Sequence, residues 1–269
     1  MTLMIEVKPA LSLVHLKHVG TTSRWRNEAM RSHATPRLIH ITKGQGRITV
    51  AGLTNGYGPN NLILIPPHTM YGIEIGPTVF AQMMALPDDA GMPAKPFHLR
   101  LRDVGPQKEL QSYFEAIERE LQPGGDARAV TSYQVLLSIF IERQLAIHGA
   151  TASDTRRDTA TAKLVARYTS LIAQEFRSDW TVAHYADALH VTPTHLTRCC
   201  QQTCSQSALK ILNERIHYEA CLLLRDTRTP VQDIATRLGF HSAAYFTRAF
   251  KEKTGATPTD FRHAKQQRR

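Results

Sequence analysis

Two Thr-Arg pairs are the residues of this sequence whose type and spacing best suit a defined chemistry. Thr197-Arg198 and Thr247-Arg248 each lie within a segment of helical pattern, fifty residues apart. An arginine on the exposed face of a helix can donate two hydrogen bonds to O6 and N7 of guanine, which contributes about 1 to 3 kcal/mol of discrimination. The alternative for both arginines is a salt bridge that braces the helix. The pairs therefore indicate base recognition in DNA, with bracing as the alternative.

The sequence gives little support for a metal site or a catalytic site, since both need clustered side chains of particular types. The four cysteines fall between Cys199 and Cys221 without a CxxC pair or a CxxC/HxxxH arrangement, so we expect no zinc site. Reduced, buried thiols acting as small hydrophobic groups are the better interpretation, and oxidant sensing is a minor alternative. His33, His40 and His68 lack the His-x-His spacing of a catalytic metal site. We expect no metal, no cofactor, no catalytic residue and hence no enzyme.

The Thr-Arg pairs belong to a longer unit that occurs twice. Residues 181–211 align with residues 230–261 at apolar and polar positions alike, with one extra residue in the second copy. Each copy has the pattern of a helix-turn-helix: a short helix with a buried alanine, a turn, and a second helix. Gly239 stands where the turn of the second copy needs a positive φ, and His190 has that place in the first. The sequence predicts two helix-turn-helix units.

Capping residues and a long connecting helix define how the units are arranged. Thr192-Pro193 and Thr257-Pro258 each place a threonine N-cap before a proline at the first helical position, and residues 229–232 predict a capping box. Residues 209–227, between the copies, have apolar side chains at helical spacing and can form a rigid strut. A tandem pair on one strut can insert two recognition helices into major grooves about 34 Å apart without a dimer.

A family resemblance appears at this point. Residues 213–262, NERIHYEACLLLRDTRTPVQDIATRLGFHSAAYFTRAFKEKTGATPTDFR, resemble the C-terminal signature of AraC/XylS-type transcriptional regulators, and the resemblance extends back to Leu164. It implies two helix-turn-helix subdomains joined by a linker helix, with double-stranded DNA and RNA polymerase as partners. The base-reading residues that it implies are Thr194, Thr197 and Arg198 in the first unit and Ala243, Ala244, Thr247 and Arg248 in the second.

The two units are not equal readers. Ala243 and Ala244 offer only methyl contacts to thymine, so the first unit is expected to supply more of the sequence discrimination. The first unit departs from the family pattern at Ser205, where glycine is usual, at Ala208 and in its cysteines. The resemblance favours an activator, although the residues themselves leave activation and repression open.

The N-terminal half has a different pattern. Residues 11–86 carry short β-like runs separated by Gly, Asn and Pro, which predicts a small sandwich or barrel. TKGQGRITVAG (residues 42–52) and YGPNNLILIPPHTMYGIEI (residues 57–75) resemble, more weakly, the cupin-like sensor domain that many of these regulators carry. Asn60 stands where glycine is common, and asparagine tolerates the left-handed conformation. The resemblance implies a barrel that holds a small effector.

Helical spacing follows the strands. Residues 109–122 and 129–149 predict a helical hairpin, whose second helix is apolar on more than one face around Val135–Ile141 and is expected to contact a second copy of the chain. Residues 150–163 have no large apolar side chain and predict a linker. The fold class is therefore α+β with two domains. We predict a cupin-like effector-binding and dimerisation domain over residues 1–149, a linker over 150–163 and a DNA-binding domain over 164–269.

The best signal for the effector is a group of arginines around one tryptophan. Guanidinium groups beside an aromatic ring suit carboxylates, phosphates or nucleotides, and a solvated basic loop is the alternative. The segment therefore predicts the rim of a pocket for an anionic effector, such as a sugar acid or a nucleotide second messenger. The rim candidates are Arg24, Trp25, Arg26 and Arg31.

Composition bounds the function. The net charge is +10, from 33 Lys and Arg against 23 Asp and Glu, which favours a polyanionic partner but is also compatible with a solvated surface. No apolar run nears the roughly 20 residues of a membrane helix, and no export signal is evident, so a cytoplasmic protein is expected. We interpret the chain as a ligand-responsive, dimeric regulator that binds direct-repeat operator sites. The alternatives are an architectural DNA binder and a cupin enzyme fused to a DNA-binding domain.

Overall fold

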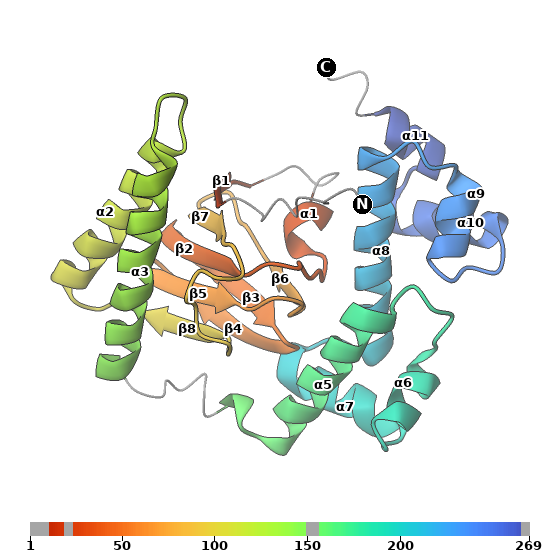
Figure 1. Cartoon of the computed structure of the whole chain (residues 1–269). Coiled ribbons are helices and arrows are strands. Elements are labelled where there is room, and N and C mark those ends of the chain that lie inside the picture. The colour runs from red at the N-terminus through yellow and green to blue at the C-terminus, as the bar shows by residue number, and fades with distance from the viewer. Residues whose placement is uncertain (1–10, 19–23, 149–155, 265–269) are drawn as a thin grey trace, which may run out of the picture.

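The computed structural model describes residues 11–18, 24–148 and 156–264. Two antiparallel sheets form an N-terminal β domain, a helical hairpin lies on one side of it, and a helical domain follows on the other (Figure 1). The predicted order of a β-sheet domain followed by a helical domain is therefore confirmed. No helix in the described ranges is long and apolar enough to cross a membrane.

The two sheets of the β domain enclose one core. The larger sheet has the order β1-β7-β2-β5-β8 and the smaller the order β4-β3-β6. Alternate side chains of the larger sheet face the smaller one, as Ile39 and Ile63 do, or face away from it, as Leu38 and Leu62 do. Asn60 has the expected left-handed backbone, at φ 61°. The strands are β1 (Ser12–Leu16), β2 (Arg37–Lys43), β3 (Gly46–Val50), β4 (Leu53–Tyr57), β5 (Asn61–Ile65), β6 (Tyr71–Ile73), β7 (Phe80–Ala85) and β8 (Phe97–Arg100).

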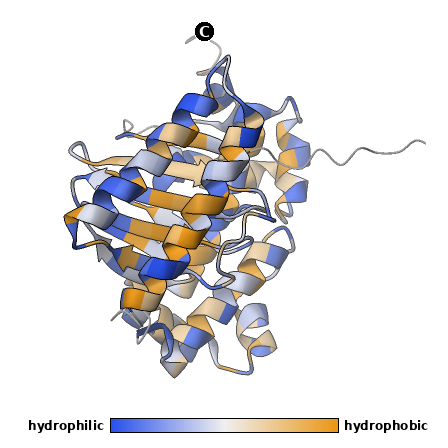
Figure 2. Ribbon diagram, turned by 60° about the vertical axis from the view of Figure 1, so that its left-hand side comes forward, coloured by the Kyte–Doolittle hydropathy of each residue, from blue (hydrophilic) through white to orange (hydrophobic). Residues whose placement is uncertain are grey.

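The predicted helical hairpin is present as α2 (Val104–Glu120) and α3 (Ala127–His148). Its helices cross the larger sheet on the face away from the smaller sheet (Figure 2). Phe114, Leu137 and Phe140 are among the hairpin side chains buried in the core that the two elements share. The opposite face of α3 stays exposed in this chain.

The helical domain begins inside the predicted linker. Helix α5 starts at Ala160, and Thr159 caps it by accepting a hydrogen bond from the Ala162 amide at 3.2 Å. Residues 160–163 are therefore helical because alanine and lysine favour a helix once a threonine caps it. Part of the linker, residues 150–155, lies outside the described residues. The remaining helices are α1 (Trp25–Glu28), α5 (Ala160–Glu175), α6 (Val182–Ala188), α7 (Pro193–Cys204), α8 (Ala208–Asp226), α9 (Val231–Arg237), α10 (Ala243–Thr254) and α11 (Pro258–His263).

The internal repeat is confirmed in the backbone. Helices α6 and α9 both have 7 residues, and α7 and α10 both have 12. The turns use left-handed residues at the same place, with φ 57° at His190 and 75° at Gly239. The helix ends match as well, since Ser205 has φ 55° where Gly255 has 77°. The two units therefore have the same local geometry despite different residues at these turns.

The capping predictions have mixed outcomes. Thr192 and Thr257 cap α7 and α11 as expected, each followed by proline at the first helical turn. The capping box predicted at residues 229–232 is wrong, because α9 begins at Val231 with Pro230 as its N-cap residue. The Thr229 amide instead donates a hydrogen bond to the hydroxyl of Thr227, in the turn that precedes α9.

The two domains share a hydrophobic core. Trp25 of α1 is 8% exposed and packs edge-on against Tyr218 of α8, with ring centroids 5.6 Å apart, and against Phe261 of α11 at 6.3 Å. A second contact joins the β3–β4 turn to α5, where a β-carbon on Gly52 would lie 2.3 Å from Val165. The C-terminal domain is thus packed on the β domain as well as connected to it by the chain.

Gly239→Ala should destabilise the C-terminal domain more than Gly255→Ala. Both glycines have a left-handed φ, which costs a residue with a β-carbon about 1 to 2 kcal/mol. Only at Gly239 would the new β-carbon meet backbone, 2.5 Å from the carbonyl oxygen of Ser178, whereas Gly255 has open space. Urea unfolding followed by circular dichroism measures both losses, and equal losses would contradict this account.

Candidate nucleic-acid interface and effector cavity

The first recognition helix presents three of the predicted residues on one face. Thr194, Thr197 and Arg198 of α7 follow an i, i+3, i+4 spacing, which places them side by side. Thr194 and Arg198 are exposed and Thr197 is half-buried. The Arg198 guanidinium lies 3.1 Å from Nδ1 of His195, one turn back. This contact holds the arginine along the helix without neutralising its charge.

The second recognition helix repeats the arrangement. Ala244 and Arg248 of α10 are exposed, and Ala243 and Thr247 are half-buried. The bracing alternative required an acidic partner, and no ion pair within the described ranges involves either Arg198 or Arg248. Both guanidinium groups are therefore available to an external acceptor.

The two faces are held in place by different side chains of one hydrophobic core. Helix α7 buries Leu196 and Cys200, and burial raises the pKa of the Cys200 thiol to about 12. Helix α10 buries Phe246 and Phe250, whose ring centroids lie 5.8 Å apart. All four cysteines are free and buried, in agreement with the interpretation of thiols as small hydrophobic groups. No group of three or more His, Cys, Asp or Glu in the described part of the chain could hold a metal ion.

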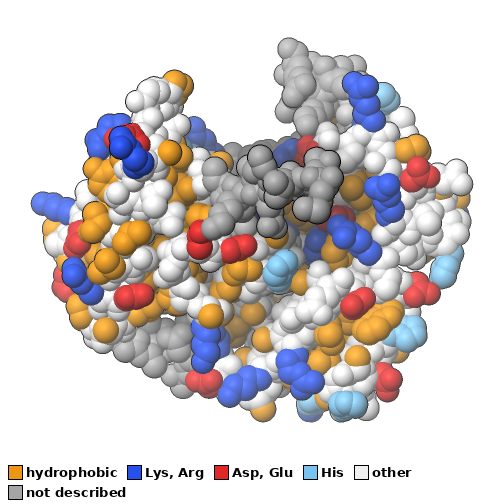
Figure 3. Space-filling view, viewed as in Figure 1, with side chains coloured by type: hydrophobic (Ala, Val, Ile, Leu, Met, Phe, Trp, Pro, Cys, Tyr) orange, Lys and Arg blue, Asp and Glu red, His pale blue; other side chains and the backbone are white. Residues whose placement is uncertain are grey.

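One exposed side chain beside the predicted face had no signal in the sequence. Tyr245, next to Ala244 on α10, is 61% exposed, although the helical pattern allowed either a buried or an exposed ring. Its hydroxyl can donate and accept hydrogen bonds, which the neighbouring alanines cannot do. Lys and Arg side chains are scattered over the face shown in Figure 3, so the net charge does not identify the interface by itself.

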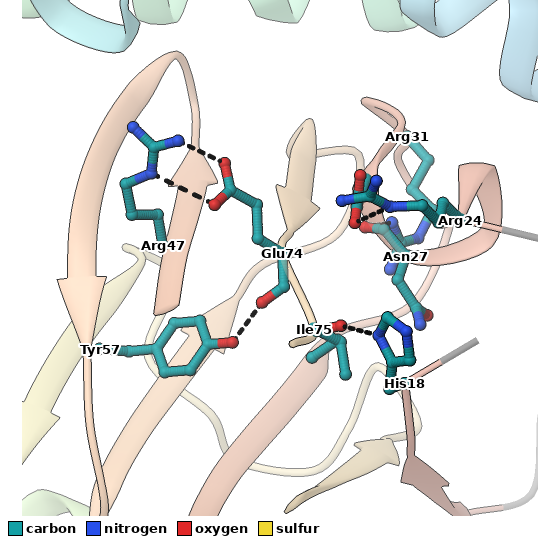
Figure 4. Close-up of polar contacts among 9 residues, drawn as sticks. His18, Arg24, Asn27, Arg31, Arg47, Tyr57, Glu74 and Ile75 are labelled. Atoms are coloured by element: carbon teal, nitrogen blue, oxygen red, sulfur yellow. Dashed lines mark hydrogen bonds and ion pairs between the residues drawn. The ribbon is translucent and has the colours of Figure 1, made fainter. Parts of the chain in front are cut away.

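The structure places the four predicted effector-binding residues in different environments. Arg24 is exposed and pairs with Glu28 at 2.9 Å (Figure 4). Arg26 stacks on the ring of Trp25, with its guanidinium carbon 4.8 Å from the ring centroid. Arg31 is only 2% exposed and donates to the carbonyl oxygen of Asn27 at 2.5 Å. The Arg31 guanidinium also lies over the ring of Tyr71 at 4.2 Å. The backbone and the ring therefore hold Arg31 inside the protein.

Arg24 and Trp25 line a cavity of about 760 Å³ at the contact between the domains. Arg26 and Arg31 are not among its lining residues. The opposite wall comes from α8, α10 and α11 and includes Lys253 and Glu214. Desolvation at the cavity wall lowers the pKa of Lys253, whose side chain is exposed, and raises the pKa of the half-buried Glu214. The lining residues are Arg24, Trp25, Glu28, Ala29, Glu214, His217, Arg225, Lys253, Thr254, Ala256, Asp260, Phe261 and Ala264.

Comparison with known proteins identifies relatives of the C-terminal domain. Residues 185–264 match a family model described as a helix-turn-helix domain. The arabinose operon regulatory protein of Escherichia coli K12 is 33% identical over 85 residues, which cover 32% of this chain and 29% of that protein. The transcriptional activator RhaR of Escherichia coli O1:K1 is 25% identical over 116 residues, which cover 43% of this chain and 41% of that protein.

A structural likeness extends over more of the chain. The crystal structure of ToxT from Vibrio cholerae with a bound unsaturated fatty acid covers 94% of this chain and 94% of its own, at 11% identity and a TM-score of 0.45. The sequence matches themselves span less than half the length of the two curated relatives described above.

Proposed function

The chain belongs to the AraC/XylS-type transcriptional regulators through its C-terminal domain, and we propose that it is a ligand-responsive regulator binding direct-repeat operator DNA. In this proposal α6–α7 and α9–α10 are two helix-turn-helix units, and α8 is the linker helix between them. The regulator works in the cytoplasm and contacts RNA polymerase as an activator. Transcription in vitro with purified RNA polymerase tests whether the chain activates. An activator should raise the transcript yield from its promoter, whereas a repressor would lower it.

The observation that carries the proposal is the matched pair of exposed faces on α7 and α10. Each face has an arginine without an acidic partner in the described residues, at the same position of a 12-residue helix. Equal helix lengths and equal turn geometry give both arginines the same placement relative to their units. Each arginine can then donate two hydrogen bonds to a guanine in the major groove.

Arg198→Ala and Arg248→Ala should each relax base preference at one position of the operator. Loss of a bidentate contact costs about 1 to 3 kcal/mol for the preferred base and little for the other three. Selection of bound sequences from a randomised operator library measures this change. Arg167→Ala is the matched control, because it removes the same charge from an exposed site on α5.

A uniform loss of affinity for all sequences would support the architectural alternative. A phosphate contact gives that result, together with a salt dependence reduced by about one charge. Footprints of the unaltered chain should cover two similar half-sites about one helical turn apart.

We propose further that the β domain is a cupin-like sensor whose anionic effector binds in the cavity between the domains. Arg24 and Lys253 provide positive charge from the two opposite walls, and Trp25 provides an aromatic surface. An effector there would alter the packing of Trp25 against Tyr218 and Phe261. Binding can shift the domain arrangement only if the effector has different affinities for the docked and released forms.

Arg24→Ala should abolish stabilisation by an anionic effector, whereas Arg26→Ala should preserve it. Both arginines are exposed in the same short segment, but only Arg24 lines the cavity. The measurement is thermal unfolding of the full chain with sugar acids and cyclic nucleotides, where saturation at 100 times Kd stabilises by about 2.7 kcal/mol. If no anion stabilises the unaltered chain, or if the two variants respond alike, this cavity is not the effector site.

We propose that the exposed face of α3 joins two copies of the chain. Val135, Leu136 and Ile139 are 49%, 45% and 37% exposed and follow one another along α3. A soluble monomer rarely leaves such a contiguous apolar stripe uncovered, and a symmetric pair of identical helices would cover it.

Leu136→Lys combined with Ile139→Lys should convert a dimer into a monomer at concentrations where the unaltered chain is dimeric. Each copy would bring two lysines to the helix pair, and these four side chains would lose hydration without gaining a partner. Sedimentation equilibrium gives the association state. Val14→Lys is the control, because Val14 is 47% exposed and belongs to β1 instead of α3. A monomeric unaltered chain, or a dimer that survives the double change, would remove this interface.

A further inference from the structure

The two recognition helices place different side chains beside their matched arginines. Residues three apart on a helix are neighbours on its surface. His195 stands three positions before Arg198 on α7. Tyr245 stands three positions before Arg248 on α10. The first unit thus has a half-buried imidazole at this position, and the second has a phenol ring that is 61% exposed.

The His195 ring makes two contacts that require one neutral form. Nη2 of Arg198 lies 3.1 Å from Nδ1 of the ring, and Sγ of Cys199 lies 3.6 Å from Nε2. Arginine has N–H donors and no acceptor, so Nδ1 must accept and carries no proton. The proton of the neutral ring is then on Nε2, which donates to the sulfur of Cys199. The partner of one ring nitrogen therefore fixes the state of the other.

The second unit has no such contact. The Tyr245 ring packs on Phe240, with centroids 5.9 Å apart, and makes no hydrogen bond to Arg248 within the described part of the chain. A phenol ionises near pH 10 in water, far from neutral pH. The surroundings of Arg248 are therefore expected to stay the same where histidines titrate.

Charged side chains on the other elements packed on α7 make no ion pair with His195 in the described ranges. Strand β4 has no charged residue, and the His184 ring of α6 accepts from the Thr181 amide at 3.1 Å. Arg198 is therefore the charged side chain that bonds to the ring. The charged or titratable side chains of the three helices on α7 include Lys163, Arg167 and Glu175 of α5, His184 and Asp187 of α6, and Lys210, Glu214, Arg215, His217, Glu219, Arg225 and Asp226 of α8.

Protonation of His195 would break its contact with Arg198. Histidine ordinarily changes charge between about pH 5 and 8. The neutral ring accepts from the guanidinium, so the hydrogen bond is present on the alkaline side of this titration and is lost on the acid side. The protonated ring has two N–H donors and no acceptor, and its positive charge repels the guanidinium.

The contact places Arg198 where a recognition helix reads bases. The N-terminal residues of such a helix contact the base edges, and His195 draws the guanidinium toward that end of α7. One of the five N–H donors of Arg198 goes to His195, which leaves enough donors for a bidentate contact to guanine. A side chain that is already ordered avoids an entropic cost on binding of about twofold to tenfold in affinity.

We propose that His195 is a positioning residue for Arg198, and that it makes base recognition by the first unit dependent on pH while recognition by the second unit is not. The inference rests on the proposed function, because Arg198 must read a base for its position to matter. It adds a residue outside the predicted base-reading set and gives the two units different responses to acid.

Binding of the full chain to operator duplexes at about pH 5.5 and about pH 8, on either side of the histidine range, tests the proposal. Fluorescence anisotropy at constant ionic strength compares the operator with duplexes changed at the base pair read by Arg198 or at the one read by Arg248. From pH 8 to pH 5.5, discrimination at the Arg198 base pair should fall by about twofold to tenfold. Discrimination at the Arg248 base pair should stay constant. An equal change at both base pairs, or at neither, would overturn the proposal.

Two variants of His195 separate positioning from a general effect of acid. His195→Asn keeps an acceptor bonded to Cγ, where Nδ1 is, but cannot titrate, so discrimination should stay high at both pH values. His195→Leu removes the acceptor, and its discrimination should be low at both. His241→Asn, which removes an exposed histidine just before α10, is the control and should keep the pH dependence. Thermal unfolding checks that each variant folds. A pH dependence that survives in His195→Asn would overturn the positioning role.

Two further outcomes distinguish this inference from the function on which it rests. The absence of any base preference at the Arg198 base pair at pH 8 would overturn the proposed function, and this inference with it. A preference that is equally strong at both pH values would overturn only the role of His195. If acid raises affinity for all sequences and leaves discrimination unchanged, His195 contacts phosphate and does not position Arg198.

Discussion

The packing of one short helix of the β domain against the C-terminal domain is the contact on which the arrangement of the whole chain depends. Trp25 of α1 inserts between Tyr218 and Phe261, which belong to the helix between the repeats and to the last described helix. Behind it, Arg31 is fixed over Tyr71 and within 5.9 Å of the Tyr218 ring. Burying an aromatic ring of this size is among the largest apolar contributions that one side chain can make.

This contact also limits how the domains can move relative to each other. A chain whose domains were joined only through the linker predicted over residues 150–163 could reorient its C-terminal domain freely. Because α1 and the β3–β4 turn both pack on the helical domain, reorientation must first expose Trp25 and part of the shared core to water. The energetic barrier to rearrangement thus lies in side-chain packing more than in the connecting segment.

Local patterns predicted the repeat well because its determinants are local. A left-handed turn residue, a threonine cap followed by proline, and apolar residues at helical spacing each act within a few residues of chain, and these features appear as expected at His190, Gly239 and Thr192. The location of Trp25 could not be predicted in this way. Its environment is made by residues nearly two hundred and more positions away, and no spacing rule connects such distant segments. The same holds for Arg31, which looked like a pocket residue in sequence and is buried under Tyr71.

The cysteines of α7 have a consequence for how such sequences can vary. Cys200 is smaller than Phe250, its counterpart in the second unit, and it belongs to the same core as Tyr168 of α5 and Tyr185 of α6, both fully buried. The tyrosines pack edge-on at 5.6 Å, and the Tyr168 hydroxyl donates to the Ala208 carbonyl oxygen at 2.8 Å. Since protein cores conserve total volume more strictly than the identity of single residues, a larger side chain at position 200 requires a smaller one at 168 or 185. Among homologous chains, these three positions should therefore covary in size, and a bulky residue at all three should be selected against.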